Sequence, residues 1–397
     1  MSNGALSGIR IIDLTRILAG PICTMNLGDM GAEILKIEHP ERGDDTRSWG
    51  PPFVEGEAAY FLGINRNKRS MTLNLKEEDG KKILRTLLEN ADILIENFKA
   101  GTLESWGFTR DWIEKNLPHL IHCSITGYGD IGPKGGMPGY DFLLQAESGL
   151  MSITGEKDGD PSKLGVAIVD VCTGQYAAMT ILAALNARNN TNEGQRIELS
   201  LYNTSLSMLI NVASNYLVGK QLPKRYGNGH PNIVPYSDFK CSDGFIAIAV
   251  GNDSQFARLA RCLGQSEWAE DNFFKTNAQR VINREVLEKK LTMILTKKRV
   301  RDWLDLFERN NIPCSKINSV SEALESEQAK ANEMVLEQSH PTAGRLKTLG
   351  IPFKFSKTPA KITLHPPLLG ADTDDILREI VGLEPTKIAK LRKDNII

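Results

Sequence analysis

The chain has 397 residues, of which 41% are hydrophobic and 24% charged, so it has the composition of a globular protein and enough length for two domains. Its formal net charge of −1 gives no electrostatic reason to expect nucleic-acid or membrane-surface binding. No apolar run approaches the roughly 20 residues that span a bilayer, and the N-terminus resembles neither a signal nor a transit peptide. We therefore expect a cytoplasmic protein, with no membrane partner and no nucleic-acid partner.

The first forty residues predict a strand, a helix and a second strand. Residues 9–14 form an apolar run, residues 23–30 have a helical period, and residues 32–38 are predicted to form the next strand. Pro21 suits the first turn of the helix. A strand–helix–strand unit requires parallel pairing of its strands, so this region predicts a parallel sheet.

The same alternation continues along the first half of the chain. Strands are predicted at 70–75, 92–97 and 120–125, with an amphipathic helix at 79–90. This pattern predicts an α/β fold with an open, Rossmann-like parallel sheet, and such sheets bind ligands at the carboxyl ends of their strands. Polar residues gather at those ends, among them Thr15, Arg16, Glu38, His39, Asn97 and Thr126.

Asp170 is our candidate nucleophile. The apolar run 165–169 predicts a buried strand, and a helical pattern opens at Thr173 and Gly174. A carboxylate at such a junction meets backbone N–H groups and the positive end of a helix dipole, which would help to keep it ionised and nucleophilic. Asp is also a preferred helix N-cap, and from this segment alone the cap is the commoner explanation.

A change of character near residue 220 predicts a second domain. Residues 224–231 are rich in turn formers, strands are predicted at 236–240 and 245–250, and residues 289–310 predict mainly helix. The expected organisation is a large domain, a linker, a smaller α+β domain, a second linker and a return to the large domain, at 1–200, 201–224, 225–320, 321–345 and 346–397.

Several familiar site patterns are missing from the sequence. There is no P-loop, no dinucleotide-binding glycine fingerprint and no G-x-S-x-G elbow. The six cysteines form no C-x-x-C pair and the histidines have no i, i+4 spacing, so we expect neither a metal site nor disulfides. The basic stretch 65–70 is either a solvated loop or a phosphate-facing patch, and the glycine-rich loop 127–136 allows close approach to a bulky ligand.

Nine short motifs follow one another along almost the whole chain: Leu14–Pro21, Gly31–Pro40, Gly43–Arg47, Asn65–Ser70, Glu96–Phe98, Ser124–Gly129, Gly139–Asp141, Asp170–Gly174 and Pro367–Gly370. Each motif alone is weak, but the ordered set is specific. It resembles the class III CoA-transferases, the family of formyl-CoA and carnitine CoA-transferases.

This resemblance implies a site and an assembly. The Asp of the D-x-x-T-G motif is the family's nucleophile, which corresponds to Asp170. A CoA thioester is the substrate, with no tightly bound cofactor, and the family fold is an interlocked homodimer. Residues expected to line the CoA site are Ile17, Ala19, His39, Leu73, Lys76, Asn97, Phe98 and Tyr140.

Three positions depart from the formyl-CoA transferase pattern. His39 and Ser105 stand where arginines contact the nucleotide, so other cations must hold CoA, and Lys76, Arg47 or the 66–69 patch are candidates. Leu18 replaces a Gln that faces the acyl group, which weighs against formate and oxalate as substrates.

Two alternatives remain open beside a transferase. The superfamily contains α-methylacyl-CoA racemases, which use a Gly-His-Asp triplet, but this chain has Gly139-Tyr140-Asp141, and tyrosine with a pKa near 10 is a poor partner base. The other alternative is a non-catalytic CoA-binding protein in which Asp170 is only a cap.

The segment Arg225–Tyr236 resembles the succinyl-CoA:glutarate-type, dicarboxylate branch of the family. The sequence therefore predicts transfer of CoA from succinyl-CoA to a dicarboxylate through an aspartyl–acyl mixed anhydride. A second carboxylate on the substrate favours a fixed guanidinium, for which Arg16 and Arg47 are candidates. Residues 227–229 either line or cover the site or form a plain turn.

Overall fold

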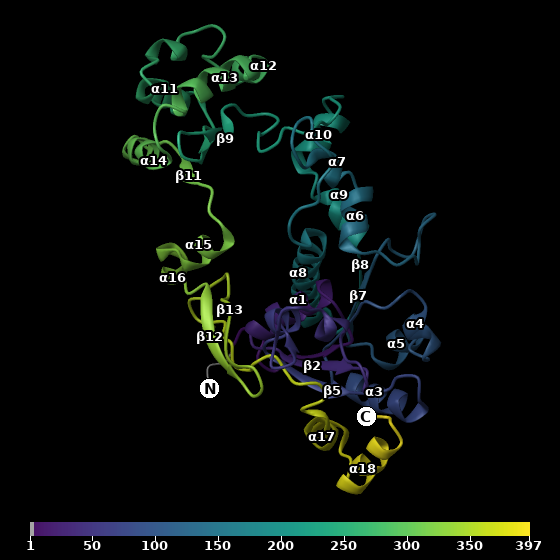
Figure 1. Ribbon diagram of the computed structural model, residues 1–397. Coiled ribbons are helices and arrows are strands. Elements are labelled where there is room, and N and C mark those ends of the chain that lie inside the picture. Colours follow the sequence, from purple (N-terminus) through teal and green to yellow (C-terminus); the bar gives the residue numbers. More distant parts are fainter. Residues whose placement is uncertain (1–3) are drawn as a thin grey trace. The chain divides into compact units, whose positions relative to one another are not determined.

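The computed structural model describes residues 4–397, which divide into two compact units (Figure 1). The first unit comprises the described residues up to Ser148, together with Gly165–Met208 and Glu327–Ile397. The second comprises Gly149–Leu164 and Leu209–Ser326. Each unit has its own hydrophobic core, so each is described separately.

A six-stranded sheet, parallel throughout, forms the centre of the first unit. The expected α/β fold with an open parallel sheet is therefore confirmed. Its strands, in spatial order, are β5 (Lys68–Thr72), β2 (Glu33–Glu38), β1 (Arg10–Asp13), β6 (Ile93–Glu96), β7 (Ile121–Thr126) and β8 (Arg196–Ser200). The strand order reverses between β1 and β6, and ligands of open α/β sheets bind at such a switch point.

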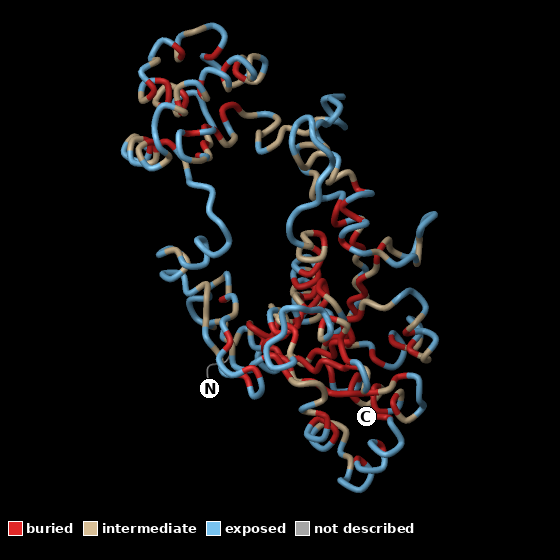
Figure 2. Tube along the Cα trace, in the orientation of Figure 1, coloured by how far each residue is buried: buried red, intermediate tan, exposed pale blue. Residues whose placement is uncertain are grey.

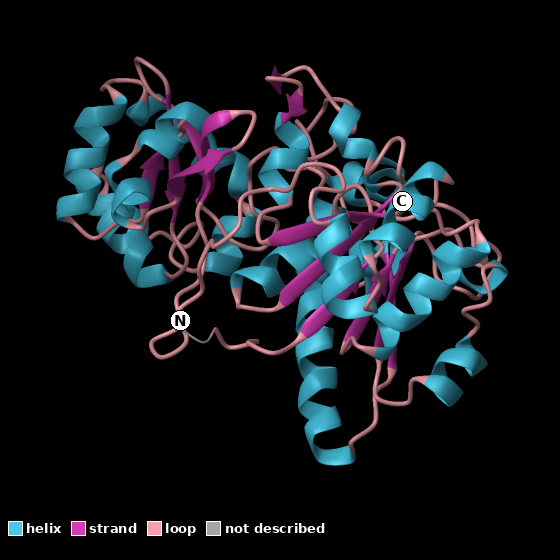
Figure 3. Cartoon of the chain, turned by 90° about the horizontal axis from the view of Figure 1, so that it is seen from below, coloured by secondary structure: helices cyan, strands magenta, loops and turns pink. Residues whose placement is uncertain are grey.

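All strands except β8 are mostly buried, because helices cover both sides of the sheet (Figure 3). Ile12 pairs with Leu35 on one side and Leu94 on the other, and all three are fully buried. They share a core with α3 (Glu78–Glu89), α5 (Arg110–Asn116) and α18 (Pro385–Lys393). Figure 2 shows this buried centre in red.

Two helices of the first unit, α1 (Ala19–Asp29) and α8 (Ile168–Thr191), lie side by side. By length and composition alone, α8 is the one described helix that could cross a membrane. Core helices of soluble proteins pass the same test, and α8 packs against α1 and β7. The remaining elements of this unit are η1 (Asp45–Ser48), β3 (Phe53–Val54), β4 (Glu57–Ala58), α2 (Ala59–Ile64), α4 (Thr102–Ser105), α6 (Asp141–Glu147), α9 (Leu201–Ser207), α16 (Glu327–Ala331), β12 (Val335–His340), β13 (Gly344–Leu349), α17 (Thr373–Ile376) and η3 (Leu377–Val381).

The second unit is built around a three-stranded antiparallel sheet, with β10 (Phe245–Ala249) between β9 (Tyr236–Lys240) and β11 (Cys314–Lys316). Ile246 and Ile248 point from β10 into a core shared with the helices. This is the smaller α+β domain that the sequence predicted. Its helices are α7 (Leu150–Ile153), α10 (Ile210–Leu217), α11 (Asp253–Cys262), η2 (Ser266–Ala269), α12 (Asn277–Ile282), α13 (Arg284–Leu295), α14 (Val300–Arg309) and α15 (Val320–Glu325).

Residues 149–164 belong to the second unit, although the sequence placed them within the large domain. Gly149 has φ 92°, a left-handed conformation that redirects the chain after α6. Arg225 then holds the segment, because its guanidinium donates to the carbonyl oxygens of Ser152, Glu156 and Gly159 at 3.2, 3.2 and 2.6 Å. Inside the predicted linkers 201–224 and 321–345 the structure also has helices and part of a β-hairpin.

The strand predicted at 165–169 is wrong. Helix α8 begins at Ile168, and Val166 before it is 59% exposed. A short apolar run does not by itself distinguish a buried strand from the first turn of a buried helix. The helix therefore starts five residues earlier than Thr173, where the sequence placed its opening.

Candidate active site

Asp170 lies in the first turn of α8, not at the end of a strand. The N-cap position belongs to Ala167, so Asp170 is not the cap of this helix. The capping oxygen comes from another element: Val169 N donates to Asp141 Oδ1 at 2.7 Å, and Asp141 is the first residue of α6. Asp141 thereby fixes the turn of α8 that carries Asp170.

The carboxyl group of Asp170 has an unusual electrostatic environment. Burial, followed by the negative charge of Asp141, raises its pKa to about 7. Desolvation thus outweighs the effect of the helix terminus, which the sequence analysis expected to favour the ionised form. Across residues 4–397, no hydrogen bond or ion pair holds the Asp170 carboxylate. A poorly solvated, unpaired carboxylate is well suited to nucleophilic attack.

Tyr60 is a further candidate for the site, and the sequence analysis did not identify it. It lies on α2, and burial together with the negative charges of Asp170, Asp141 and Asp44 raises the pKa of its hydroxyl. The hydroxyl thus stays protonated and remains a hydrogen-bond donor. No sequence pattern marks Tyr60, because its neighbours in space are distant in the chain. Tyr140, at the N-cap of α6, is 59% exposed.

Gly174 explains how α8 approaches the first βα turn so closely. A Cβ atom built on Gly174 would lie 2.5 Å from the carbonyl oxygen of Ala19, the first residue of α1. Only glycine allows the two helices to pack at this distance. Asp170 is one helical turn before Gly174 on α8, so the motif's last residue brings the start of α8 close to the first residue of α1.

A cavity of about 260 Å³ lies at the carboxyl ends of β1, β2, β5 and β6, around the switch point of the sheet. Of the residues that the sequence assigned to the site, it brings together Arg16, His39, Leu73, Lys76 and Phe98. Ile17, Ala19, Asn97, Arg47, Tyr140 and Asp170 do not line it. Its volume is below the roughly 300–1,000 Å³ of typical small-molecule sites, so it suits one part of a long ligand.

The cavity is cationic. Arg42, Lys76 and Lys99 line it, and within the described part of the chain none of these side chains forms an ion pair with a carboxylate. Burial and the charges of Arg42 and Lys76 lower the pKa of His39. Arg42 and Lys99 were missed by the sequence analysis, because single basic residues in loops carry no signal without the surrounding fold.

Two larger cavities, of about 450 and 590 Å³, lie along β7 and β8. Their basic side chains already have partners: Lys134 pairs with Glu147, and Arg196 pairs with Glu198. The smaller cavity is therefore the better candidate for an anionic ligand.

The basic stretch 66–69 is neither a solvated loop nor a phosphate-facing patch. The guanidinium of Arg66 pairs with buried Asp29 at 2.7 Å, and fully buried Lys68 lies 3.3 Å from Asp13. Arg69 pairs with Glu33 and Glu379. These side chains join parts of the first unit to one another, so they are not available to CoA phosphates.

The two arginines considered for a substrate carboxylate differ in their surroundings. The Arg47 guanidinium makes two bonds to Glu38, at 2.7 and 2.8 Å, and stacks 3.7 Å from the ring centre of Phe61. Arg16 instead pairs with Asp45 at 2.9 Å, and both side chains are about 40% exposed. An exposed pair of this kind costs little to break, whereas opening a buried one is expensive.

Comparison with known proteins identifies the family. The model of CoA-transferase family III matches residues 6–373. The chain belongs to CoA-transferase family III. It is 44% identical over 392 residues to the succinyl-CoA:glutarate CoA-transferase of Mus musculus, covering 99% of this chain and 90% of that protein. It is 41% identical to the succinate–glutarate CoA-transferase of Agrobacterium fabrum, covering 96% and 97% of the two chains.

A solved structure has the same fold. The CAIB/BAIF family protein from Brucella suis superposes with a TM-score of 0.82 at 42% identity, covering 95% of this chain and all of that one. A CoA-transferase of this family is an enzyme that acts on CoA thioesters, so the expected family and enzyme class are confirmed.

Proposed function

We propose that this CoA-transferase moves CoA from succinyl-CoA to a dicarboxylate such as glutarate, with Asp170 as the nucleophile. The observation that carries the proposal is the unpaired carboxylate of Asp170. It lies one helical turn from Gly174, which packs against Ala19 at the end of the β1–α1 turn, and other residues of that turn line the cationic cavity. The names of the relatives from Mus musculus and Agrobacterium fabrum support this pair of acids.

The proposed chemistry consists only of acyl exchanges at a carbonyl carbon. Asp170 attacks the thioester carbon of succinyl-CoA, the C–S bond breaks, and a succinyl–aspartyl anhydride forms with CoA thiolate retained. The thiolate then attacks the aspartyl carbon and releases succinate. Glutarate displaces the thiolate from the aspartyl thioester, and the thiolate finally takes the glutaryl group and frees Asp170. No step requires net proton transfer, so a lone carboxylate suffices.

Tyr60 is our candidate for stabilising these steps. Its protonated hydroxyl lies in the field of Asp170 and Asp141, and a hydrogen-bond donor near a developing oxyanion lowers the barrier to acyl transfer. An anhydride is readily hydrolysed, so the site has to exclude water during turnover.

The cationic cavity is proposed to hold the phosphates of CoA. Arg42, Lys76 and Lys99 supply the charge that formyl-CoA transferase obtains from arginines at the positions of His39 and Ser105. Leu73 and Phe98 supply its apolar wall. Replacing Arg42 by Ala should weaken CoA binding about tenfold, the value of one charge-assisted hydrogen bond. An unchanged Kd for CoA would remove Arg42 from the phosphate site.

The second carboxylate of the acceptor is assigned to Arg16. Its pair with Asp45 is exposed and can be exchanged for a substrate carboxylate at little cost. Arg16→Leu should reduce the preference for glutarate over valerate by about ten- to a hundredfold in kcat/KM. Equal losses with both acids would mean that Arg16 serves CoA or the fold.

The family's interlocked homodimer is proposed for this chain as well. Large apolar side chains are exposed on α8 and α10, among them Met179 at 54% and Leu217 at 65%. Light scattering should give twice the 43.9 kDa of one chain, and should not change on dilution. A monomer at micromolar concentration would overturn this assignment. We place the enzyme in the cytoplasm.

One experiment tests the reaction directly. The protein is incubated with succinyl-CoA and glutarate in deuterated water, and the products are identified by mass spectrometry. Glutaryl-CoA should form with wild type and not with Asp170→Ala. Glutaryl-CoA formation by the variant would exclude Asp170 as the nucleophile. A second incubation contains 2-methylacyl-CoA and no acceptor acid. Rapid exchange of its α-proton for deuterium would favour the racemase alternative.

A further inference from the structure

The turn between β1 and α1 contains a strained residue. Ile17 has φ 71°, in the left-handed region that β-branched residues almost never adopt. The next residue, Leu18, is the N-cap of α1 and makes no side-chain capping bond. Such a conformation persists only where surrounding groups enforce it, and strain of this kind concentrates at functional sites.

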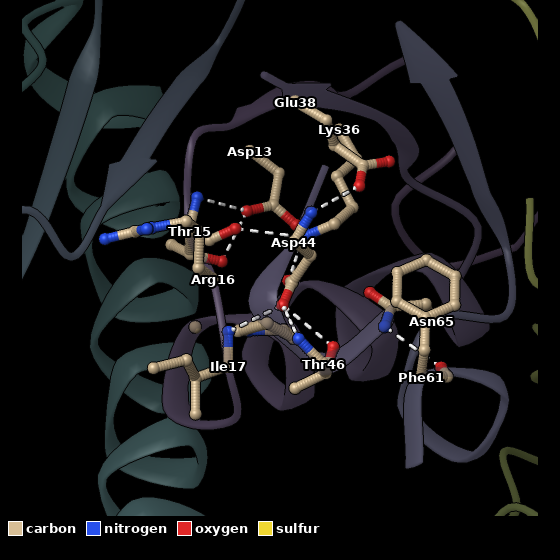
Figure 4. A network of polar contacts seen from close by, with 12 residues as sticks. Asp13, Thr15, Arg16, Ile17, Lys36, Glu38, Asp44, Thr46, Phe61 and Asn65 are labelled. Atoms are coloured by element: carbon tan, nitrogen blue, oxygen red, sulfur yellow. Dashed lines mark hydrogen bonds and ion pairs between the residues drawn. The ribbon is translucent and has the colours of Figure 1, made fainter. Parts of the chain in front are cut away.

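Three side chains hold three consecutive residues of this turn. The Lys36 ammonium donates to the carbonyl oxygen of Thr15 at 2.9 Å. Asn97 uses its whole carboxamide on Arg16, accepting from the backbone N–H at 2.9 Å and donating to the carbonyl at 2.8 Å. Asp44 Oδ1 accepts from the strained Ile17 N–H at 3.2 Å. Figure 4 shows the contacts of Lys36 and Asp44 with this turn.

The residues that hold the turn are themselves fixed. Lys36 and Asp44 form an ion pair of 2.8 Å, and neither side chain is exposed to solvent. Asp44 also accepts two bonds from Thr46, and its backbone N–H donates to Glu38. A buried ion pair gives a protein little net stability, so stability alone does not explain this arrangement.

We infer that Asp44, together with Lys36 and Asn97, positions the CoA thioester. Asp44 holds Ile17 in the left-handed conformation, and this fixes the path of the preceding residues Thr15 and Arg16, which line the cationic cavity although Ile17 does not. Thr15, Arg16 and Asp44 itself line that cavity. At its other end the turn runs into Ala19, against which Gly174 of α8 packs. The turn therefore links the CoA cavity to the helix of Asp170. This inference rests on the proposed function, since it concerns the same site.

The test compares Asp44→Ala with Asp29→Ala. Asp29 is a matched control, because it is also a buried carboxylate with a basic partner, Arg66, but it makes no bond to the turn. Both variants should lose thermal stability. Calorimetry should show a roughly tenfold higher Kd for CoA with Asp44→Ala and no change with Asp29→Ala. Without Asp44, the ratio of the relaxed to the left-handed conformation of Ile17 should rise about five- to a hundredfold, because the left-handed conformation is strained. Equal Kd values for the two variants would overturn the inference.

Ile17→Gly provides the decisive second measurement. Glycine adopts positive φ without strain, so this substitution in the Asp44→Ala background should recover most of the lost CoA affinity. No recovery would show that Asp44 acts in another way. If Asp44→Ala does not fold, Asn97→Ala is the alternative variant, because it removes the contacts with Arg16 and leaves no buried charge without a partner. It should also raise the Kd for CoA. An unchanged Kd would contradict the inference. A wild-type protein that binds no CoA would instead refute the proposed function itself.

Discussion

Asp13, the last residue of β1, and Asp44, the N-cap of η1, contrast with Asp170 and Asp141, which lie at the starts of α8 and α6. All four carboxyl groups lie within the first unit. Burial disfavours ionisation of Asp13 and Asp44, but Lys68 and Lys36 outweigh it and lower the pKa of both, that of Asp44 to about 2. Near Asp170, burial has no cation to oppose it, and the pKa rises to about 7.

This difference separates structural charge from reactive charge. A carboxylate with cations and several donors around it is stable as an anion and attacks poorly. A carboxylate that is desolvated and unpaired is unstable as an anion, and forming a covalent bond relieves it. Substitutions in one group or the other should therefore have opposite effects on stability.

Asp170→Asn should abolish CoA transfer, with a loss of about 10⁴-fold or more in kcat, because the nucleophile is removed. It should also stabilise the protein. The folded-state pKa lies above the unfolded value, so Asp170 costs stability as the pH rises from about 4 to about 7. Tm should therefore increase by a few degrees at pH 8 and hardly at all at pH 4. A lower Tm at pH 8 would mean that the carboxylate has a stabilising partner.

Asp13→Asn should do the opposite: it should destabilise the fold. Lys68 is fully buried, and burial already lowers its pKa to about 8 despite the nearby charge of Asp13. Losing one member of a buried pair costs about 3–5 kcal/mol in the free energy of unfolding, measurable with urea. Asp13→Asn combined with Lys68→Met should regain part of the loss. The exposed pair of Asp79 and Lys82 is a control, since Asp79→Asn should cost less than about 1 kcal/mol.

Gly174→Ala tests the link between the two regions. The added Cβ would meet the backbone oxygen of Ala19 at 2.5 Å, so α8 must move away from α1. A displacement of about 1 Å at a reacting group can lower the rate a hundredfold, and we expect a kcat loss of that order. Gly63→Ala in α2 is the control, because its Cβ would enter open space. Similar activities of the two variants would mean that the close approach is unimportant for catalysis.

Asp141→Asn should give the smallest change. Its side-chain oxygen can still accept from Val169 N, so the first turn of α8 stays in place, but the negative charge is gone. The pKa of Asp170 should then fall by up to about one unit, and the acid limb of the kcat/KM profile should shift to lower pH. An unshifted limb would assign the raised pKa of Asp170 to burial alone.

The sequence predicts much of the sheet correctly. β1, β2, β6 and β7 are short apolar runs flanked by turn formers, and such runs identify strands. The same reasoning wrongly predicted a strand at 165–169, because over five residues neither the period nor the length of an apolar run distinguishes a strand from a helix. The β12–β13 hairpin was missed because its strands carry charged residues at many positions, among them Glu337, Arg345 and Lys347.

The electrostatics of the site could not be predicted from the sequence. The partners of the basic stretch are far away along the chain: Asp13 is 55 residues from Lys68, and Asp29 is 37 residues from Arg66. Asp141 was recognised as part of a motif, but its cap on α8 and its effect on Asp170 depend on the fold. Family motifs locate a site, and the fold determines the protonation of its groups.

The C-terminal segment affects the order in which the chain can fold during synthesis. Ile376, Leu391 and Ile396 are buried in the same core as Ile12 of β1, and Asn74 N donates to the carbonyl oxygen of Ile396 at 2.7 Å. The core begun by the first strand therefore cannot close until residues 376–396 have left the ribosome. The core of the second unit consists of residues between 234 and 312, so this core can form before the C-terminal residues complete the core of the first unit.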